Sequence, residues 1–358
     1  ATWMLTTIGA GSAKGKTKPF NYADSYSGSK LRDQCLAQIE MLKADPTDEN
    51  NVQFTSKYAT SHATQRGVVL RRIIQIYWRS PSYNMVRLLV SVIVALLFGS
   101  VYASQRVPRS EGDMNSRVTS IFITFLFLSV NAMNTVLAVF EVERNMFYRH
   151  KAALMYTEKA LLLGFTLAEL PFIILASFAF CLGFYFLVGF STLFYKMALY
   201  FLFFTLNLGC WTFLGQMMMS LFRDSVTAQG FGGLMISLTS LFSGLLIRPD
   251  NLKGTFWVFM YWLMPGHYVL EGLVASQFHE DDTTIEANPG SPFFEFNNCT
   301  INQEEKCTGT AEDWIFVSFG GAFQWENVPW NVLYLVGLLI SARLITWFAL
   351  TKFNYLAK

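Results

Sequence analysis

Residues 118–140 read VTSIFITFLFLSVNAMNTVLAVF, a run without a single charged side chain. As a helix, this run is long enough to cross the roughly 30 Å hydrocarbon core of a bilayer. A helix also satisfies its own backbone hydrogen-bonding groups, which lipid cannot do. The stretch therefore predicts a transmembrane helix, and its surroundings decide what kind of membrane protein this is.

Similar apolar stretches recur along the chain, which is 53% hydrophobic and only 15% charged. Soluble globular proteins carry about 25% charged residues. The predicted spans cover about 86–104, 118–140, 160–188, 197–222, 225–247 and 328–351. The sequence thus predicts an all-α integral membrane domain with six helices. Its basic residues are scattered, which argues against nucleic acid as a partner.

The flanks of the spans predict the topology. Residues 66–80 form an amphipathic pattern, with Val69, Leu70, Ile73, Ile74, Ile76 and Tyr77 on one face and Arg71, Arg72, Gln75 and Arg79 on the other. This pattern is typical of a helix lying at the membrane surface. The segment 141–159 is also rich in arginine and lysine, so both are predicted to be cytoplasmic. With six spans, both termini are then cytoplasmic and 1–65 is a polar cytoplasmic linker.

The large segment 248–327 is consequently predicted to lie outside. Pro265, His267 and Glu271 interrupt its aromatic part, 251–278, which favours re-entrant or interfacial helices over a crossing. Further on, Asn298-Cys299-Thr300 fits a glycosylation sequon. Cys299 and Cys307 would share an oxidising compartment, so we predict a disulfide between them.

The sequence matches no complete catalytic motif. GAGSAKGKT at 9–17 resembles a phosphate-binding loop, but Ala10 stands where its first glycine is required. We interpret it as a flexible linker, and we expect no cofactor, metal or catalytic site in this chain. Glu169 is an intramembrane charge. We favour a paired carboxylate that supports a bend at Pro171 over a proton-coupling role, and we expect Arg343 to snorkel to the inner interface.

Five short motifs together resemble a known family. They are ATWML at 1–5, VFEVERNMFYRH at 139–150, LAELPF at 167–172, LFSGLLIRPDNL at 241–252 and YWLMPGHYVLEGLVASQF at 261–278. In this order they resemble the second transmembrane domain of full-size pleiotropic drug resistance transporters, in the G subfamily of ABC transporters. His150 departs from that pattern, where the family has Glu. The resemblance implies an ABC-2 type fold whose nucleotide-binding domains, which hold ATP and Mg²⁺, lie upstream of Ala1.

The resemblance also implies roles for individual residues. Coupling to the nucleotide-binding domain would involve Glu143, Arg144, Phe147, Tyr148 and Arg149. The substrate path would include Phe125, Phe127, Asn131 and Asn134 of the second span and Ser237, Ser240 and Phe242 of the fifth. Asn131 stands where some relatives carry a stacking Phe. Gly230, Gly232 and Gly233 would allow close helix approach. Leu245 and Leu246 would form an outer plug.

These observations predict half of an ATP-driven exporter of amphipathic or hydrophobic compounds, in the plasma membrane. Its partners would be the nucleotide-binding domains, a second transmembrane half on the same polypeptide, the bilayer and a hydrophobic small molecule. Three alternatives stay open: an ion- or proton-coupled transporter or channel using Glu169, a membrane-bound enzyme, and a scaffold that transports nothing.

Overall fold

The computed structural model describes residues 22–44, 56–297, 299 and 307–355. The chain divides into two units, 1–57 and 58–358, which we describe separately. The first unit contains α2 (Tyr22–Ser27) and α3 (Lys30–Ala44). The motif at 1–5, the glycine-rich stretch at 9–17 and the sequon residue Asn298 lie outside the described residues.

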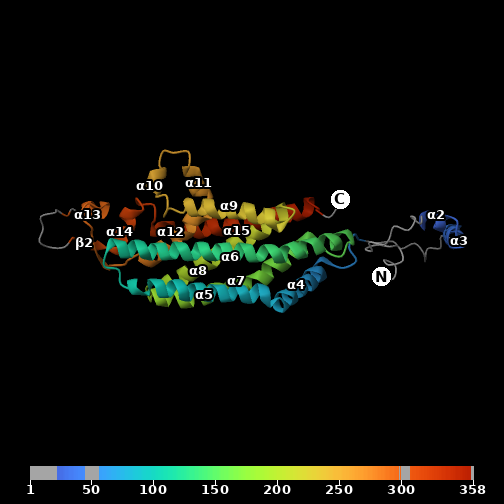
Figure 1. Cartoon of the computed structure of the whole chain (residues 1–358), viewed down its shortest axis with the longest axis horizontal. Coiled ribbons are helices and arrows are strands. Elements are labelled where there is room, and N and C mark those ends of the chain that lie inside the picture. Colours follow the sequence, from blue (N-terminus) through green and yellow to red (C-terminus); the bar gives the residue numbers. More distant parts are fainter. Residues whose placement is uncertain (1–21, 45–55, 298, 300–306, 356–358) are drawn as a thin grey trace, which may run out of the picture. The chain divides into compact units, whose positions relative to one another are not determined.

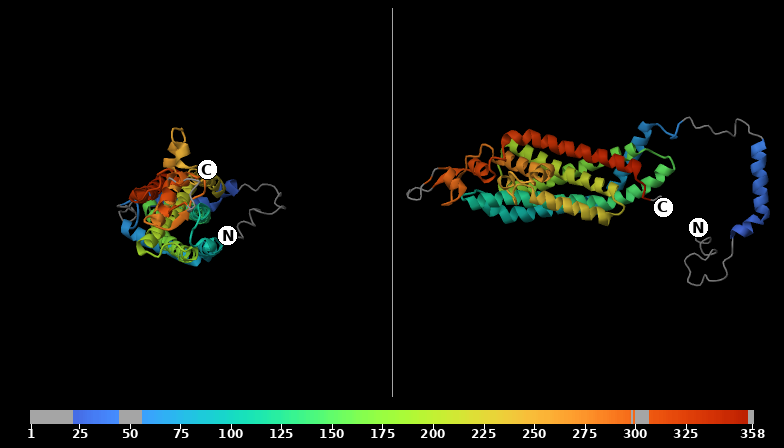
Figure 2. Two further views of the ribbon diagram at one scale, coloured as in Figure 1. Left: turned by 90° about the vertical axis from the view of Figure 1, so that its left-hand side faces the viewer. Right: turned by 90° about the horizontal axis from the view of Figure 1, so that it is seen from above.

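Long helices running side by side make up most of the second unit (Figures 1 and 2). They are α4 (His62–Arg79), α5 (Pro81–Tyr102), α6 (Glu111–Ala152), α7 (Glu158–Val188), α8 (Phe194–Leu221), α9 (Ser225–Leu241) and α15 (Val328–Lys352), with the short η2 (Ala103–Gln105) after α5. Within the described residues, five helices are long and apolar enough to cross a membrane, namely α5, α6, α7, α8 and the helix ending at Lys352. The predicted all-α membrane fold is confirmed.

The ends of two helices differ from the predicted spans. α6 has 42 residues, so at 1.5 Å per residue it is about 63 Å long, twice the hydrocarbon thickness. Ser110 and Asp113 form a capping box that starts it early. α9 is shorter than the predicted 225–247 and has only 17 residues. The chain turns just after it, at Gly244, whose φ of +98° is a conformation that glycine tolerates best.

Short elements fill the segment between α9 and α15. They are α10 (Pro249–Leu252), α11 (Val258–Leu263), α12 (Pro265–Phe278), β1 (Thr284–Glu286), α13 (Pro292–Phe296), β2 (Thr308–Thr310), α14 (Ala311–Ser318) and η3 (Trp325–Asn327). β1 pairs antiparallel with β2, with Thr284 opposite Thr310. The 14 residues of α12 span only about 21 Å, too short for a crossing. α12 is nevertheless almost wholly buried, against α8 and α15.

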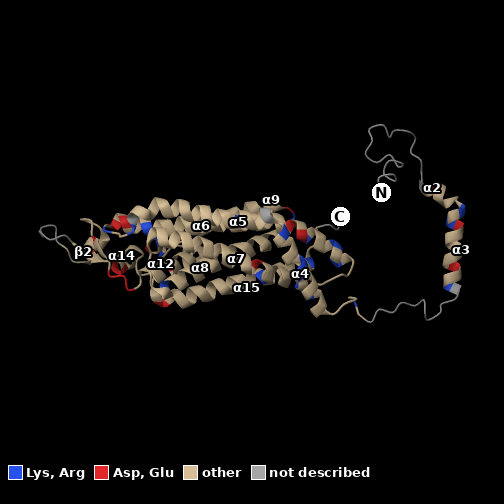
Figure 3. Cartoon of the chain, turned by 90° about the horizontal axis from the view of Figure 1, so that it is seen from below, with Lys and Arg blue, Asp and Glu red and all other residues tan. Residues whose placement is uncertain are grey.

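The bundle has two ends, which we name by their elements (Figure 1). At the α4 end lie the start of α4, the C-terminal ends of α6 and α15, and the turn between α8 and α9. At the strand end lie β1, β2, α13 and α14. Figure 3 shows that most charged residues of the bundle lie toward these two ends, with a small mixed cluster inside the bundle. A charge-poor middle between charged ends is what a bilayer requires.

α4 packs on α7 through Val69, Ile73 and Tyr77, which recur every fourth residue and are buried. Gly164 of α7 makes this approach possible, because a Cβ atom there would lie 2.7 Å from Ile73 Cδ1. Ile74 of the predicted apolar face remains exposed. The buried stripe is therefore narrower than the face predicted from the sequence.

The glycines of α9 do not behave alike. A Cβ on Gly232 would lie 2.4 Å from Met133 Sδ of α6, whereas Gly230 and Gly233 face open space. Of these three glycines, Gly232 alone allows a close helix approach among the described residues, and for Gly230 and Gly233 the close approach stays a prediction that would need a partner outside this chain.

We predict that Gly266→Ala destabilises the junction of α12 and α9. Its Cβ would lie 2.7 Å from the backbone oxygen of Thr239, which cannot rotate away. Overpacking of this kind costs about 1–3 kcal/mol. The measurement is the thermal unfolding midpoint of the purified full-length protein. Gly337→Ala is the matched control, because no atom lies within 4 Å of its added Cβ. Equal midpoints for the two variants would contradict this packing.

Candidate coupling segment and translocation face

The predicted coupling residues lie on the last turns of α6, at the α4 end, and not in a loop. Glu143 is 5% exposed and forms a 2.7 Å ion pair with Arg72 Nη2 of α4. Lys151 pairs with Glu158 of α7 at 2.7 Å and donates to the backbone oxygen of Leu350 of α15 at 3.0 Å. The end of α6 is therefore tied to three other helices.

Arg144 makes the most extensive polar contacts of this segment. It is 1% exposed, and its guanidinium donates to the backbone oxygens of Met219, Phe222 and Arg223. The last carbonyls of a helix have no partner within the helix and carry a partial negative charge. Arg144 satisfies them at the end of α8 and so fixes the turn into α9. Asp224 in that turn caps α9 through the backbone N–H of Thr227, a bond that lowers the pKa of Asp224.

The aromatic residues of the segment are internal. Phe147 is fully buried and contacts Tyr156, with ring centroids 5.7 Å apart, while Tyr148 is buried against Tyr355. Burial raises the pKa of the Tyr156 hydroxyl. Of the five predicted coupling residues only Arg149 is exposed. Four of them therefore hold the segment together from inside.

The turn next to these residues, which we call the exposed tip, was not predicted from the sequence to be functional. Leu154 and Met155, in the turn between α6 and α7, are 44% and 57% exposed. Leu154 has a φ of +54°, an uncommon conformation for a leucine. The available signal was the apolar pair Leu154-Met155, which follows EVERNMFYRH after three further residues, within a segment predicted to lie outside the membrane.

Glu169 is the centre of a polar network inside the bundle. It is completely buried, and its carboxylate pairs with Arg87 Nη1 at 3.0 Å. It also accepts hydrogen bonds from Tyr77, Tyr83 and Gln216, at 2.7, 2.8 and 3.1 Å. The second guanidinium nitrogen of Arg87 donates to Thr212 Oγ1 at 2.6 Å. The network joins α4, α5, α7 and α8, and α7 continues as a helix through Pro171.

Arg343 belongs to the same network, contrary to the expectation that it snorkels. Its Nη1 donates to Gln216 Oε1 at 2.7 Å, and its guanidinium lies 3.5 Å from the centre of the Phe213 ring. The amide of Gln216 therefore bridges Arg343 to Glu169. The sequence alone suggested that the Arg343 side chain extends to the membrane interface. Gln216 Oε1, an acceptor inside the bundle, holds it within the bundle instead.

Part of the predicted substrate path forms one stripe on α6. Phe127, Asn131 and Asn134 follow a spacing of four and three residues, so they share a helix face. Phe127 is 51% exposed, and Asn131 and Asn134 are partly exposed. Asn134 Oδ1 accepts a 3.1 Å hydrogen bond from Gln229 of α9. The stripe and the neighbouring face of α9 therefore form one continuous surface, which we call the α6–α9 face.

Other predicted path residues lie elsewhere. Phe125 is fully buried and contacts Phe122, and Phe242 packs with Leu252, Tyr261 and Met264. Ser237 is exposed on α9 and donates to the backbone oxygen of Gly233. Ser240 is partly exposed. The structure thus brings Ser237 to the α6–α9 face but keeps the two phenylalanines inside this half.

The predicted plug and disulfide residues lie beyond α9. Leu246 is 57% exposed, whereas Leu245 packs against the main core. A disulfide joins Cys299 to Cys307, with their Cα atoms 6.0 Å apart.

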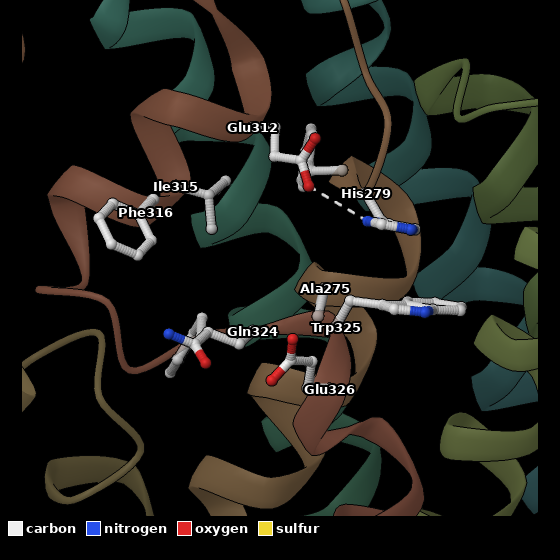
Figure 4. A pocket seen from close by; sticks show the side chains of 10 residues that line it. Ala275, His279, Glu312, Ile315, Phe316, Gln324, Trp325 and Glu326 are labelled. Carbon is white, nitrogen blue, oxygen red and sulfur yellow. Dashed lines mark hydrogen bonds and ion pairs between the residues drawn. The ribbon is translucent and has the colours of Figure 1, made fainter.

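A pocket of about 340 Å³ opens near the strand end (Figure 4). His279 stacks on Trp325 with ring centroids 4.5 Å apart, and its Nδ1 lies 3.1 Å from Glu312 Oε1. Glu326 points into the same pocket. Among the residues that the structure describes, no three His, Cys, Asp or Glu side chains are placed to hold a metal ion.

Comparison with known proteins agrees with this architecture. Residues 64–278, from α4 to the end of α12, match the family described as ABC-2 type transporter. The chain is 31% identical over 288 residues to ABC transporter G family member 31 of Arabidopsis thaliana, covering 80% of this chain and 20% of the relative. It is 31% identical over 317 residues to ABC transporter G family member 51 of Oryza sativa subsp. japonica, covering 86% and 22%.

The chain therefore spans about a fifth of the length of these relatives. The matched region contains most of α4, the ion-paired end of α6, the buried network around Glu169 except Arg343, and the α6–α9 face. Because the match covers more than half of the chain, this protein belongs to the ABC-2 type transporter family and is a membrane domain with relatives among the G family of ABC transporters.

Proposed function

We propose that this chain is the transmembrane half of an exporter that moves amphipathic or hydrophobic compounds. ATP would be hydrolysed by nucleotide-binding domains elsewhere on the same polypeptide, in the plasma membrane, with both termini of this half cytoplasmic. The names of the relatives support an ABC transporter, and the extra length of those proteins leaves room for such domains. The α4 end would then face the cytoplasm.

The α6–α9 face is the observation that carries the proposal. It presents the amides of Asn131 and Asn134 beside the ring of Phe127 on otherwise apolar membrane helices. The oxygen of Asn134 accepts from Gln229, but an amide group that faces hydrocarbon without a partner is costly. A second half or a water-filled path would satisfy it, and an uncharged face of mixed amide and aromatic groups suits amphipathic cargo.

Coupling would act through the exposed tip, Leu154 and Met155, and through Arg149. The tie between Glu143 and Arg72 and the contacts of Arg144 would pass a displacement of this tip to α4, α8 and α9. The proton-coupled alternative needs Glu169 to release and bind a proton. Its ion pair with Arg87 and its neutral donors favour a structural role instead.

The test uses the full-length protein in inside-out vesicles. We expect ATP-dependent uptake of the amphipathic dye rhodamine 6G, and we expect N131L/N134L to reduce it at least tenfold. The double variant should fold, because leucine is more favourable than asparagine in a membrane helix.

Ser341→Leu on α15 is the matched control, since it places leucine at another exposed polar position. The proposal fails if N131L/N134L transports as well as the wild type. Loss of uptake in Glu169→Gln with normal folding and normal ATP hydrolysis would instead favour ion coupling.

A further inference from the structure

A second cavity, of about 430 Å³, lies among α10, α11, α12 and the start of α15. The carboxylate of Glu271, on α12, lines it and is only 3% exposed. Its Oε1 accepts hydrogen bonds from Asn327 Nδ2 at 2.8 Å and from the backbone N–H of Gln324 at 3.4 Å. Both donors are neutral, so they leave the charge of the carboxylate uncompensated.

No lysine or arginine in the described part of the chain lies within ion-pair distance of Glu271. The cation at the rim, Lys253, pairs with Asp250 at 2.5 Å and is largely exposed. A buried charge without a counter-ion is costly, and burial raises the pKa of Glu271 accordingly. Glu169 in the same bundle shows the contrast, because it has Arg87.

Asn331 supplies a second, independent observation. It lines the same cavity and is 2% exposed. Its amide lies near the carboxylate of Glu271, yet Nδ2 makes no hydrogen bond of normal length and angle within the residues described. Buried polar groups nearly always have a partner, so this donor can turn either to the Glu271 carboxylate or to an acceptor that enters the cavity. A molecule bound in the cavity would therefore meet it best with a hydrogen-bond acceptor.

Aromatic rings form the remaining wall. Tyr261, Trp262, Tyr268 and Trp330 all line the cavity. Trp262 and Trp330 are 58% and 68% exposed and stand at its rim. Aromatic faces attract organic cations, and a desolvated cation over a ring gains about 2 kcal/mol. The volume is within the range of small-molecule sites, roughly 300–1,000 Å³.

We propose that this cavity binds an organic ammonium ion that also carries an oxygen acceptor. The ammonium group lies against Glu271 and the aromatic rings, and the oxygen accepts from Asn331 Nδ2. The site is separate from the α6–α9 face, and its occupation requires neither ATP nor transport. The inference therefore stands or falls independently of the exporter function.

The test is calorimetric titration of the purified full-length protein in nanodiscs, without ATP, with two probes of the same shape. Choline has a quaternary ammonium and a hydroxyl group, and 3,3-dimethyl-1-butanol replaces the nitrogen by carbon. We expect saturable choline binding and at least tenfold weaker binding of the neutral alcohol. Glu271→Gln should weaken choline binding at least tenfold.

Glu326→Gln is the matched control, because Glu326 lines the neighbouring pocket of Figure 4 and not this cavity. It should bind choline as the wild type does. Trp330→Leu tests the aromatic wall at an exposed position where folding is not at risk, and it should weaken choline binding severalfold. Equal binding of the two probes, undiminished binding in E271Q or W330L, or no saturable binding by the wild type would overturn the proposal.

Discussion

When Arg87 is replaced with methionine, most of the full-length protein should fail to fold, so that little folded protein is found in the membrane. Arg87 is the only cation paired with the fully buried carboxylate of Glu169 among the described residues. Methionine fills a similar volume but leaves the charge uncompensated. Removing one partner of a buried pair typically costs about 3–5 kcal/mol, a large fraction of the stability of a folded domain. The measurement is the amount and thermal midpoint of monodisperse protein extracted from membranes.

A second variant separates lost charge balance from lost packing. In R87M/E169Q both members of the buried ion pair are replaced by neutral side chains, and the amide oxygen of the substituted side chain can still accept from Tyr77 and Tyr83. We expect this double variant to recover much of the yield that R87M loses, because replacing both partners of a buried pair is often close to neutral. Arg79→Met, at an exposed position of α4, is the control and should behave as the wild type. A stable R87M variant would contradict the role assigned to the pair.

Replacing Arg144 with methionine should also have a large effect, at the α4 end. The variant leaves the backbone oxygens of Met219, Phe222 and Arg223 without their donor. Each unsatisfied buried acceptor costs about 1–3 kcal/mol, although carbonyls near the end of the bundle can recruit water. We expect a lower thermal midpoint. In vesicles we expect at least tenfold less dye transported per ATP hydrolysed, because the turn between α8 and α9 loses its tie to α6.

The matched control is Arg149→Met, the same substitution five residues along the helix. Arg149 is exposed, so its removal should leave the thermal midpoint unchanged. If the two variants unfold at the same temperature, Arg144 does not hold the helices together. If R144M lowers the midpoint but transports normally for each ATP, the segment is structural and the coupling proposal loses its support.

Hydrophobicity alone predicted the bundle, because lipid requires long uncharged helices and the sequence displays them directly. The hydrogen-bond and ion-pair partners of the buried polar side chains could not be predicted in this way. Glu169 was identified as an unusual charge, but Arg87 and Gln216 are 82 and 47 residues away along the chain. The position of the Arg343 side chain was predicted wrongly for the same reason, since its acceptor Gln216 lies 127 residues away along the chain.

The direction in which side chains point around a helix also could not be predicted from the sequence. The motif EVERNMFYRH indicated an important segment, but not that Phe147 and Tyr148 turn inward while the apolar tip beyond them turns outward. On α6, Phe125 and Phe127 are two residues apart and therefore lie on different sides of the helix. Which side is buried depends on where α8 packs against α6, and this contact joins residues that are far apart in the sequence.

The unbroken length of α6 has a mechanical consequence. Its first turn is held at the strand end, where Glu111 accepts from the backbone N–H of Asn288 and from Ser291 Oγ. Its last turn is held at the α4 end by Lys151. Because the helix is stiff, a tilt of about 5° about its first turn would move its last turn, about 63 Å away, by about 5 Å together with the helices tied to it. An antibody or nanobody bound at the strand end, close to Asn288 and Ser291, would therefore restrict movement of the α4 end, which lies more than a membrane thickness away.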